Sequence, residues 1–384
     1  MPSSVFTDSF DFSSDTSLYI HVPFCTSKCS YCAFYSVPGC HDEEMDAFTN
    51  KVVSEIEIIN GKMSGKAYVT AFIGGGNPGC LGSDRLRKIA EVVCRNGRPG
   101  EFSTEMNPES LNQSFFPLFE SCFTRLSMGV QSLDHKALAF LGRNSDLDST
   151  LRGLELSQKL HSQYRTDLSY DLITCLGKWH DELSGVKRMV SEYPSDHLSV
   201  YALTLEEGTP LYRQKPELPD SDEQYVILNR IWSYLEQQGY DHYEVSNFAR
   251  NGKRCLHNCR YWAYRQYVGL GPGGASTAFS AEGDVTRFVF RPSVKDYVKS
   301  GLFEGFEEEK LSEKESAEEE ILMGLRYKGG LDLKRLSQRV NRDIDLSKLT
   351  GLEGFSQKDG FLVPDDRGLM VADAVAERIV DALY

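Results

Sequence analysis

The sequence predicts an α/β protein built as a partial (β/α)6 barrel, followed by a small C-terminal α+β domain. Short β-like runs alternate with longer helical patterns through the first two-thirds of the 384 residues. This alternation is typical of repeated βα units with a parallel sheet. The runs are too few for a closed (β/α)8 barrel, so we expect an open or partial one. The six expected strands are 18–22, 68–73, 102–106, 125–130, 169–173 and 197–203.

Helices are expected between these strands. The first, at 42–60, carries an apolar stripe at helical spacing, formed by Phe48, Val52, Val53, Ile56 and Ile59. Further helices are expected at 83–94, 181–193 and 222–238. After one more β-like run at 243–246, a polar loop region continues to Gly274. We expect this region to cover the mouth of the barrel.

Beyond Glu304 the sequence becomes strongly charged, so we place a domain boundary there. The chain then divides into a flexible N-terminal lead-in (1–16), a barrel with an extension at its mouth (17–304) and a C-terminal domain (305–384). The last part shows helices at 312–325, 333–340, 346–352 and 372–383, with strands at 361–363 and 368–371. This order resembles a winged helix. It lacks a basic recognition helix, so we expect a packing or dimerising role rather than DNA binding.

The composition predicts a cytoplasmic protein. No apolar run approaches the ~20 residues of a membrane-spanning helix, and the first residues lack the basic start and apolar core of a signal peptide. The net charge of −14 and the pI near 5.1 argue against partners bound mainly through phosphates, so nucleic acid is not expected. Ten cysteines without a secretion signal indicate metal ligation or buried thiols in a reducing compartment.

Three cysteines at C-x3-C-x2-C spacing, Cys25, Cys29 and Cys32, directly follow the first expected strand. They would therefore lie at the carboxyl end of a strand, where α/β sheets and barrels place their active sites. The spacing indicates an iron–sulfur cluster, in which three thiolates leave one iron open to another ligand. The alternative on spacing is a structural zinc site, completed by His21, Cys40 or His41.

A glycine run follows the second expected strand, as G-G-G-N-P at 74–78. Glycines let the backbone approach a ligand closely, because no side chain stands in the way. The run does not fit the phosphate-binding pattern G-x-x-x-x-G-K-[ST]. The glycine run indicates a function only in combination with the cysteine motif.

Together with these two motifs, several further segments resemble the radical S-adenosylmethionine (SAM) superfamily, and within it the oxygen-independent coproporphyrinogen III oxidase-like family. The resemblance extends from about residue 17 to 383. The matching segments are Y-I-H-V-P-F-C at 19–25, E-M-N-P at 105–108, R-L-S-M-G-V-Q-S at 125–132, L-G-R at 141–143, Y-D-L-I at 170–173 and E-V-S-N-F-A-R at 244–250.

Two features indicate the HemW branch of that family, whose members are regarded as heme chaperones. Cys32 is followed by Ala33 and Phe34, not by the additional cysteine expected in the decarboxylating oxidases. The segment H-N-C-R-Y-W at 257–262 matches the H-N-x-x-Y-W motif of the branch. The resemblance implies heme binding and transfer to a recipient protein. The alternative is an oxygen-independent coproporphyrinogen III oxidase, which forms protoporphyrinogen IX by oxidative decarboxylation, so enzymatic activity is left open.

The resemblance also implies cofactors and their residues. Cys25, Cys29 and Cys32 would hold a [4Fe-4S] cluster whose open iron binds SAM and could cleave it to a 5′-deoxyadenosyl radical. Contacts to this SAM would come from Tyr19, Gly75 and Glu105. A second SAM-sized site is implied at Tyr31, Gly76, Asn77, Gln131, Arg143 and Asp171. For Gln131, Arg143 and Asp171, backbone capping or a structural ion pair remains the alternative.

His257 would ligate heme iron, and Tyr261 and Trp262 would offer aromatic surface to the macrocycle. The implied partners are heme or another tetrapyrrole, an electron donor, a heme-accepting protein, which can itself be membrane-associated, and a second copy of the chain. Two departures from the family bear on SAM binding. Asn77 stands where the family usually has Thr, and T-C-L-G-K-W at 174–179 replaces a G-L-P-G-Q-T-type turn.

Overall fold

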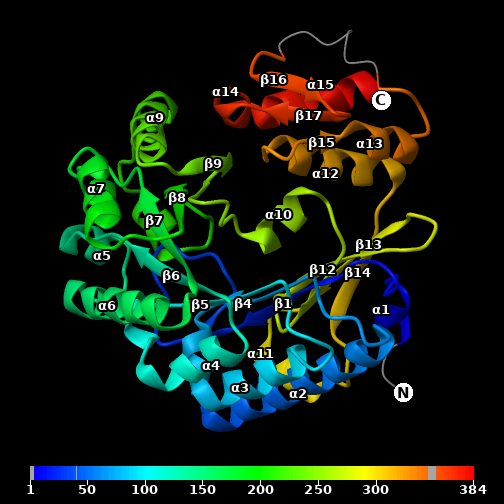
Figure 1. The fold of residues 1–384 in the computed structure, drawn as a ribbon, viewed down its shortest axis with the longest axis horizontal. Helices are drawn as coiled ribbons and strands as arrows, with labels where there is room; N and C mark the ends of the chain where they lie inside the picture. The colour runs from blue at the N-terminus through cyan, green and yellow to red at the C-terminus, as the bar shows by residue number, and fades with distance from the viewer. Residues whose placement is uncertain (1–3, 40, 345–351) are drawn as a thin grey trace.

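The computed structural model describes residues 4–39, 41–344 and 352–384. Its main body is a 12-stranded sheet in the order β14-β13-β12-β11-β1-β4-β5-β6-β7-β8-β10-β9 (Figure 1). The six expected strands lie side by side within it and are all parallel. The predicted α/β fold with a partial parallel barrel is therefore confirmed. These strands are β1 (Ser17–Val22), β4 (Thr70–Gly75), β5 (Glu101–Met106), β6 (Arg125–Gln131), β7 (Asp167–Thr174) and β8 (His197–Ala202).

The region expected to be a polar loop up to Gly274 is more ordered than the sequence suggested. It holds β10 (Asn247–Ala249), α10 (Leu256–Trp262) and β11 (Tyr267–Leu270). Strand β11 is parallel to β1 and extends the barrel by a seventh parallel strand, with Val268 and Leu270 fully buried. The expectation of a loop was wrong here, because four residues containing one glycine give little β signal without their partner strand.

Antiparallel strands extend both edges of the parallel sheet. β12 (Ala275–Phe279), β13 (Val285–Phe290) and β14 (Phe306–Lys310) follow β11, while β10 and β9 (Asp241–Glu244) follow β8. The short strands β2 (Phe24–Cys25) and β3 (Val37–Pro38) form a separate two-stranded sheet around the cysteine loop. Because β14 pairs with β13, the main sheet continues to Lys310, past the boundary expected at Glu304.

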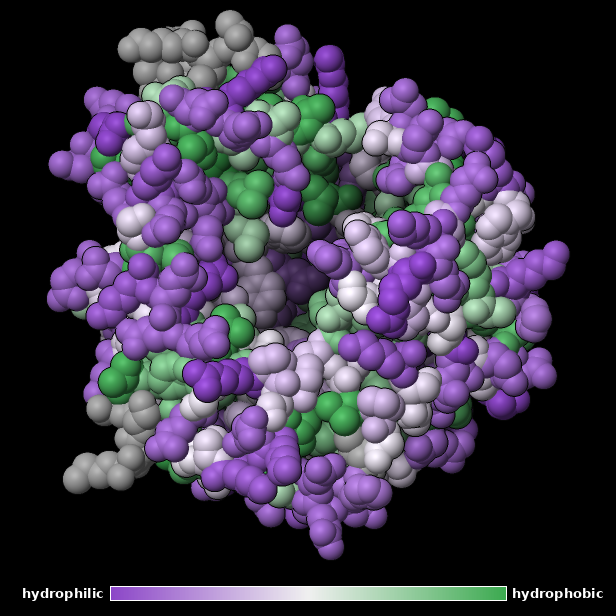
Figure 2. Space-filling view, turned by 180° about the vertical axis from the view of Figure 1, so that it is seen from behind, coloured by the Kyte–Doolittle hydropathy of each residue, from purple (hydrophilic) through white to green (hydrophobic). Residues whose placement is uncertain are grey.

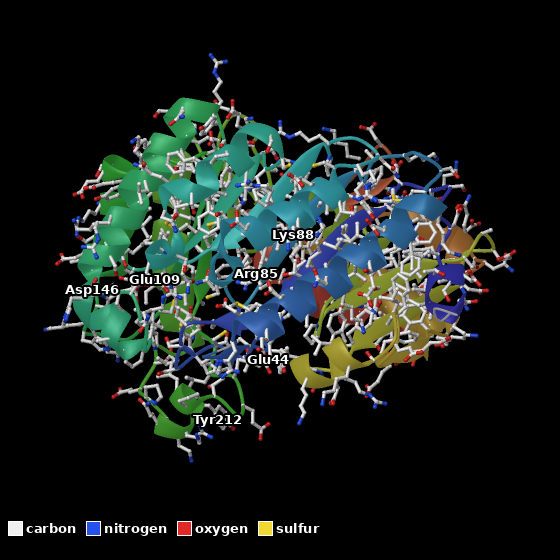
Figure 3. All side chains as sticks on the ribbon, turned by 90° about the horizontal axis from the view of Figure 1, so that it is seen from below. Glu44, Arg85, Lys88, Glu109, Asp146 and Tyr212 are labelled. Atoms are coloured by element: carbon white, nitrogen blue, oxygen red, sulfur yellow. The ribbon has the colours of Figure 1, made fainter. Side chains whose placement is uncertain are left out.

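Helices cover the outer face of the sheet (Figure 1). The stripe expected on the first helix faces the core, since Phe48, Val52 and Ile56 are fully buried. Figure 3 views this helical layer from below, where Arg85 of α3 pairs with Asp42 of α2 at 2.9 Å. The helices of the barrel part are α2 (Asp42–Lys62), α3 (Gly82–Val93), α4 (Phe116–Ser121), α5 (His135–Phe140), α6 (Leu147–Tyr164), α7 (Glu182–Glu192), α8 (Pro210–Gln214), α9 (Ser221–Gln237) and α11 (Val294–Lys299), with 3-10 turns at Pro78–Leu81, Pro108–Ser110 and Gln113–Phe115.

The N-terminal segment is packed, not the flexible lead-in expected for 1–16. It forms α1 (Ser4–Asp8), and the side chain of Phe6 is fully buried. The Phe6 ring stacks on Phe303 at 5.1 Å and lies 5.0 Å from the ring of Phe288. The sequence feature that could have indicated this packing is the set of aromatic residues spaced through a Ser- and Asp-rich segment. Their partners lie almost 300 residues away along the chain.

The C-terminal part has its own hydrophobic core beneath a three-stranded sheet in the order β15-β17-β16. Its arrangement of helices and a small sheet is like that of a winged helix, as expected. The strand expected at 368–371 is instead helical, because Asp365 accepts a hydrogen bond from the Gly368 N–H at 2.9 Å and caps α14. The helix expected at 346–352 falls almost wholly outside the described residues. The elements are α12 (Glu313–Leu325), β15 (Leu331–Asp332), α13 (Leu333–Arg339), β16 (Phe355–Lys358), β17 (Phe361–Pro364), α14 (Asp366–Met370) and α15 (Ala372–Leu383).

Within the described ranges, no helix combines the length and the apolar character needed to cross a membrane.

Candidate functional site

The inner face of the parallel sheet is polar. Successive side chains of a strand alternate between its faces, so every second residue of β5 to β8 points inward. Glu105 of β5 is in register with Ser127 of β6, Ser127 with Ser169 of β7, and Ser169 with His197 of β8. These side chains line a cavity of about 480 Å³ inside the sheet, here called the barrel cavity. From the side opposite to Figure 1, the molecule is hollowed near the centre of its face, beneath the C-terminal part (Figure 2).

Five of the residues implied by the family resemblance line the barrel cavity: Tyr19, Glu105, Asp171, His257 and Tyr261. Burial raises the pKa of Glu105 to about 8, and the nearby charge of Asp171 adds to the shift. Burial likewise raises the pKa of Asp171, although hydrogen bonds from Ser199 and Ser127 oppose this. Two carboxyl groups in one cavity favour a ligand that brings positive charge.

The cysteine loop follows β1 and β2 at the carboxyl end of the sheet. Cys25, Cys29 and Cys32 are half-buried and form no disulfide. Burial raises the pKa of the Cys25 thiol to about 11 and raises the pKa of Cys32. The guanidinium of Arg143 donates to the Cys29 sulfur at 3.5 Å. A positive charge therefore lies beside the three cysteines.

The donor set fits an iron–sulfur cluster. Three thiols on one loop supply the soft ligands that such clusters take. The backbone of Gly76 approaches this loop so closely that a Cβ there would lie 2.9 Å from the Cys25 sulfur and 2.6 Å from the Phe24 carbonyl oxygen. In the described ranges, no group of three or more His, Cys, Asp or Glu side chains could hold a single metal ion. A cluster is larger than one ion, so its ligands lie farther apart.

Of the ligands considered for a zinc alternative, His41 is exposed at the N-cap of α2, and the other two are engaged or lie outside the described residues. The ring of His21 contacts the Tyr19 hydroxyl at 3.1 Å through Nδ1 and the Tyr35 carbonyl oxygen at 2.9 Å through Nε2. Cys40 falls outside the described residues. The structure therefore offers no closed set of zinc ligands among the described residues.

The glycine loop joins the cysteine loop to the barrel cavity. Gly75 has a positive φ of 112°, and a Cβ there would meet the His21 ring at 2.8 Å, so only glycine fits. Its N–H donates to a carboxylate oxygen of Glu105 at 3.0 Å. The N–H groups of Gly76 and Asn77 donate to the chain just before the cysteines. The loop thus presents backbone at the position where the family resemblance implies SAM.

Asn77 has a clear structural role. Its side-chain oxygen accepts hydrogen bonds from the N–H groups of Gly79 at 3.2 Å and Asn107 at 3.3 Å, and its amide donates to Ser110 at 2.6 Å. These bonds cap the 3-10 turn Pro78–Leu81 and tie it to the end of β5. A ligand contact by the Asn77 side chain would have to replace one of them.

Arg143 lies beside Tyr31, one of the other residues implied for a second SAM site, and its remaining bonds go to residues outside that set. It donates to the Gly129 carbonyl oxygen at 2.7 Å and to Asn107 at 3.2 Å, while its Nε has no hydrogen-bond partner among the described residues. The charge of Arg143 and a hydrogen bond from it oppose the burial that raises the pKa of Tyr31. Arg143 and Asp171 form no direct ion pair in the described structure, since Asp171 is bonded by serines.

Gln131 ends β6 at a register shift and has a positive φ of 66°. Its side-chain amide lies close to Gly129, where a Cβ would come within 2.9 Å of it. The positive φ is uncommon for a residue other than glycine, asparagine or aspartate, and such strain gathers at functional sites. The Gln131 amide and the Arg143 guanidinium both lie close to Gly129.

His257 lies in the barrel cavity and is almost fully buried, with 1% exposure. Nδ1 contacts the Thr70 hydroxyl at 2.8 Å, and Nε2 contacts the Tyr261 hydroxyl at 2.7 Å. Burial and the charge of Arg260 lower the pKa of His257 to about 3, so the ring is neutral at pH 7. A neutral imidazole is the form that ligates metals. Binding iron would require one nitrogen to leave its present partner.

Several cavity residues were not singled out from the sequence. Arg125 is 1% exposed, and its Nη2 has no hydrogen-bond partner within the described structure. His197 contacts Ser169 at 2.7 Å and Tyr243 at 2.8 Å. The available signal was the recurrence of polar residues at every second position of otherwise apolar strands. It identifies the inner face but not the chemistry of any one residue.

The comparisons with known proteins point in one direction. Residues 19–183 match the family model of the radical SAM superfamily, and residues 311–373 match that of the HemN C-terminal domain. The chain is 30% identical over 346 residues to the heme chaperone HemW of Bacillus subtilis, covering 86% of this chain and 88% of that protein. It is 31% identical over 382 residues to the heme chaperone HemW of Mycobacterium tuberculosis, covering 94% of each.

A vertebrate protein and a solved structure are also similar. The mitochondrial radical S-adenosyl methionine domain-containing protein 1 of Bos taurus is 32% identical over 376 residues, covering 92% of this chain and 83% of that protein. The structure of coproporphyrinogen III oxidase (HemN) from Escherichia coli superposes with a TM-score of 0.78 at 19% identity, covering 100% of this chain and 93% of that one. At this identity the likeness concerns the fold alone.

Proposed function

Because this chain belongs to the HemW branch of the radical SAM superfamily, we propose that it binds heme beside a [4Fe-4S] cluster and SAM, and transfers the heme to a recipient protein. The relatives named as heme chaperones match most of the chain, including both its barrel and its C-terminal part. The absence of a cysteine two positions after Cys32, where Phe34 stands, also favours this branch over the decarboxylating oxidases.

One observation carries the proposal: the implied heme ligand and three of the implied SAM contacts line the same cavity. His257 shares the barrel cavity with Tyr19, Glu105 and Asp171. The His257 ring centroid lies 6.5 Å from that of Tyr19 and 5.2 Å from that of Phe72. A change in the ligand bound beside Tyr19 would therefore affect His257 through direct packing of these rings.

The cluster would be held by Cys25, Cys29 and Cys32, and when bound it supplies an open iron and an electron for SAM chemistry. Arg143 donates to the Cys29 sulfur and so stabilises negative charge on the ligands. Gly75 and Gly76 keep side chains away from the neighbouring space. Glu105 offers a carboxylate oxygen that accepts hydrogen bonds from a positively charged ligand.

The environment of His257 favours a heme group that is exchanged rather than permanently bound. Its neutral ring already has two hydrogen-bond partners, the hydroxyls of Thr70 and Tyr261. Replacing the Tyr261 contact by iron and restoring it on release would leave no buried nitrogen unpaired in the heme-free protein. Such an exchange suits a protein that passes heme on.

The test is a heme titration of the anaerobically reconstituted protein, followed by its absorption spectrum. His257→Ala should weaken heme binding at least tenfold, whereas His197→Ala should leave it close to that of the wild type. His197 is a matched control, because it is also a buried histidine of the barrel cavity with both ring nitrogens bonded. Circular dichroism checks that both variants fold.

Wild-type protein that binds no heme would overturn the proposal. Equal heme affinity of the wild type and His257→Ala would remove His257 as the ligand. The second candidate, oxidative decarboxylation, is tested in the same preparation by adding coproporphyrinogen III, SAM and a reductant. Formation of protoporphyrinogen IX would assign the oxidase activity, and we expect none.

A further inference from the structure

A second cavity, here called the aromatic cavity, lies beside the barrel cavity and has a volume of about 280 Å³. Four aromatic side chains line it, Tyr261, Trp262, Tyr264 and Tyr267, together with Arg265, Arg287 and Met323. Helix α10 forms one side, and α12 of the C-terminal part lies above it (Figure 1). Neither the cluster nor the SAM site gives this cavity a role.

The aromatic cavity shares lining residues with two larger spaces. It shares Tyr261 and Tyr267 with the barrel cavity. On its other side it shares Tyr264 and Arg265 with a cleft of about 1090 Å³ between the barrel and the C-terminal part, here called the outer cleft. Tyr261 lines both the aromatic cavity and the barrel cavity, and its hydroxyl contacts His257 at 2.7 Å.

Two buried N–H groups on the walls of the aromatic cavity lack partners. Trp262 Nε1 and Arg287 Nε form no hydrogen bond within the described part of the chain. Leaving a buried donor unpaired is unfavourable, so native structures rarely contain one. Arg287 is held in place by an ion pair with Glu319, which also accepts from the Tyr264 hydroxyl at 2.9 Å. Its remaining donor is thus fixed and unused.

Arg265 adds a second guanidinium where the aromatic cavity meets the outer cleft. Its side chain makes no hydrogen bond and no ion pair among the described residues. In a chain with a net charge of −14, an arginine is surrounded by potential carboxylate partners. The charges of Asp332, Glu320 and Asp15 attract Arg265, but none of the three forms a direct ion pair with it in the described structure, so this exposed guanidinium beside an aromatic wall is available to an anionic ligand.

We propose that the aromatic cavity and the adjoining outer cleft bind a planar tetrapyrrole by its carboxylate-bearing edge, with Arg265 and Arg287 donating to the carboxylates; this rests on the proposed heme-binding function. Aromatic rings pack against a macrocycle, and guanidinium groups bind carboxylates through paired N–H donors. Met323 offers a polarizable thioether, a group that can also ligate heme iron. The cavity alone is at the lower limit for small-molecule pockets, roughly 300 Å³. The macrocycle therefore extends into the outer cleft. His257 lines the barrel cavity and neither of these two spaces, so it would not ligate the iron of a tetrapyrrole held here.

The experiment compares hemin with hemin dimethyl ester, in which both carboxylates are blocked, using the full-length reconstituted protein. Wild type should bind hemin about tenfold more tightly than the ester, a difference of about 1.4 kcal/mol. Arg265→Glu should bind hemin about tenfold more weakly and lose the preference. Arg265→Ala, which adds no new charge, should lose the preference as well. Arg230→Glu, an exposed arginine on α9, is the control and should behave as wild type.

The outcomes separate this inference from the function on which it rests. If wild type binds neither compound, heme binding itself is wrong. If wild type binds hemin and the ester equally, or Arg265→Glu and Arg265→Ala keep the preference, the carboxylates bind elsewhere and this inference is overturned. If only His257→Ala weakens hemin binding, the heme lies wholly in the barrel cavity and the heme-binding function stands without the site proposed here.

Discussion

A carboxylate oxygen of Glu105 accepts a hydrogen bond of 3.0 Å from the backbone N–H of Gly75. This bond joins the glycine loop after β4 to the end of β5, next to the cysteine loop. Only a glycine reaches this conformation without meeting the His21 ring. One face of Glu105 is therefore fixed by the backbone, while the other is exposed to a cavity that also contains Asp171. Together, Glu105 and Asp171 make this edge of the cavity suitable for a cationic ligand.

Glu105→Gln should stabilise the ligand-free protein at high pH. The folded-state pKa of Glu105, about 8, lies above the ordinary value of 4.5. The stability that comes from its protonated form is present below about pH 4.5 and is lost as the pH rises through about 8. We expect the variant to raise the free energy of unfolding by about 1–2 kcal/mol at pH 8.5 and by less at pH 5. Urea denaturation at both pH values measures this.

The same variant should weaken SAM binding, because the carboxylate is the expected partner of the ligand's positive charge. Glu120→Gln, which replaces an exposed carboxylate on α4, serves as the control for both measurements. A gain in stability that is equal at the two pH values would show that Glu105 does not titrate in this range.

Arg143→Ala should lower the reduction potential of the reconstituted cluster. The guanidinium donates to the Cys29 sulfur, and its charge favours the more negative, reduced state. One charge-assisted hydrogen bond corresponds to roughly 50–100 mV for a one-electron couple. Arg143→Lys should lie between the wild type and Arg143→Ala. A redox titration followed by electron paramagnetic resonance measures the shift, with Arg152→Ala on the exposed side of α6 as control. An unchanged potential would contradict the assigned role.

Asn77→Ala should destabilise the fold by about 1–2 kcal/mol, because it removes a helix cap and a buried hydrogen-bond acceptor together. Asn77→Thr should cost less, since a hydroxyl can accept the bond from Gly79 but cannot also reach Ser110. Chemical denaturation of the two variants side by side provides the measurement. Equal stability of Asn77→Ala and wild type would mean that the turn after β4 is held by other contacts.

Phe6→Ala should destabilise the protein by about 3–4 kcal/mol, as expected for removing a fully buried aromatic ring. The neighbouring Val5, which is 51% exposed, gives the control Val5→Ala, with an expected change within about 0.5 kcal/mol. Thermal and urea unfolding both report on this. If the two substitutions had the same small effect, the N-terminal segment would not belong to the core.

The parallel strands could be predicted from the sequence because each is a short apolar run followed by a helix. Strand β11 could not, since its four residues become a strand only through pairing with β1, some 250 residues earlier in the chain. The same holds for Phe6, whose partners lie in β13 and beyond. Local patterns contain no information about such distant partners.

In the candidate site, too, local motifs could be predicted and contacts between distant residues could not. The cysteine motif and the glycine run could be recognised, because their spacing is local. The contact of Arg143 with Cys29 joins residues 114 positions apart and became visible only in the structure. The buried Arg125 and the hydrogen-bonded His197 were missed for a related reason: their strands show the alternation of a half-polar face, but nothing local distinguishes a cavity residue from a surface one.

The most direct test of the central claim is a metal and sulfide analysis of protein prepared under strict anoxia, with its electron paramagnetic resonance spectrum recorded with and without SAM. The account predicts iron and acid-labile sulfide in equal amounts and a spectrum that changes when SAM is added. The signal should be lost when Cys25, Cys29 and Cys32 are replaced by Ala, and kept in Cys80→Ala, another half-buried cysteine. Protein that contains one zinc ion per chain and no sulfide would contradict the account.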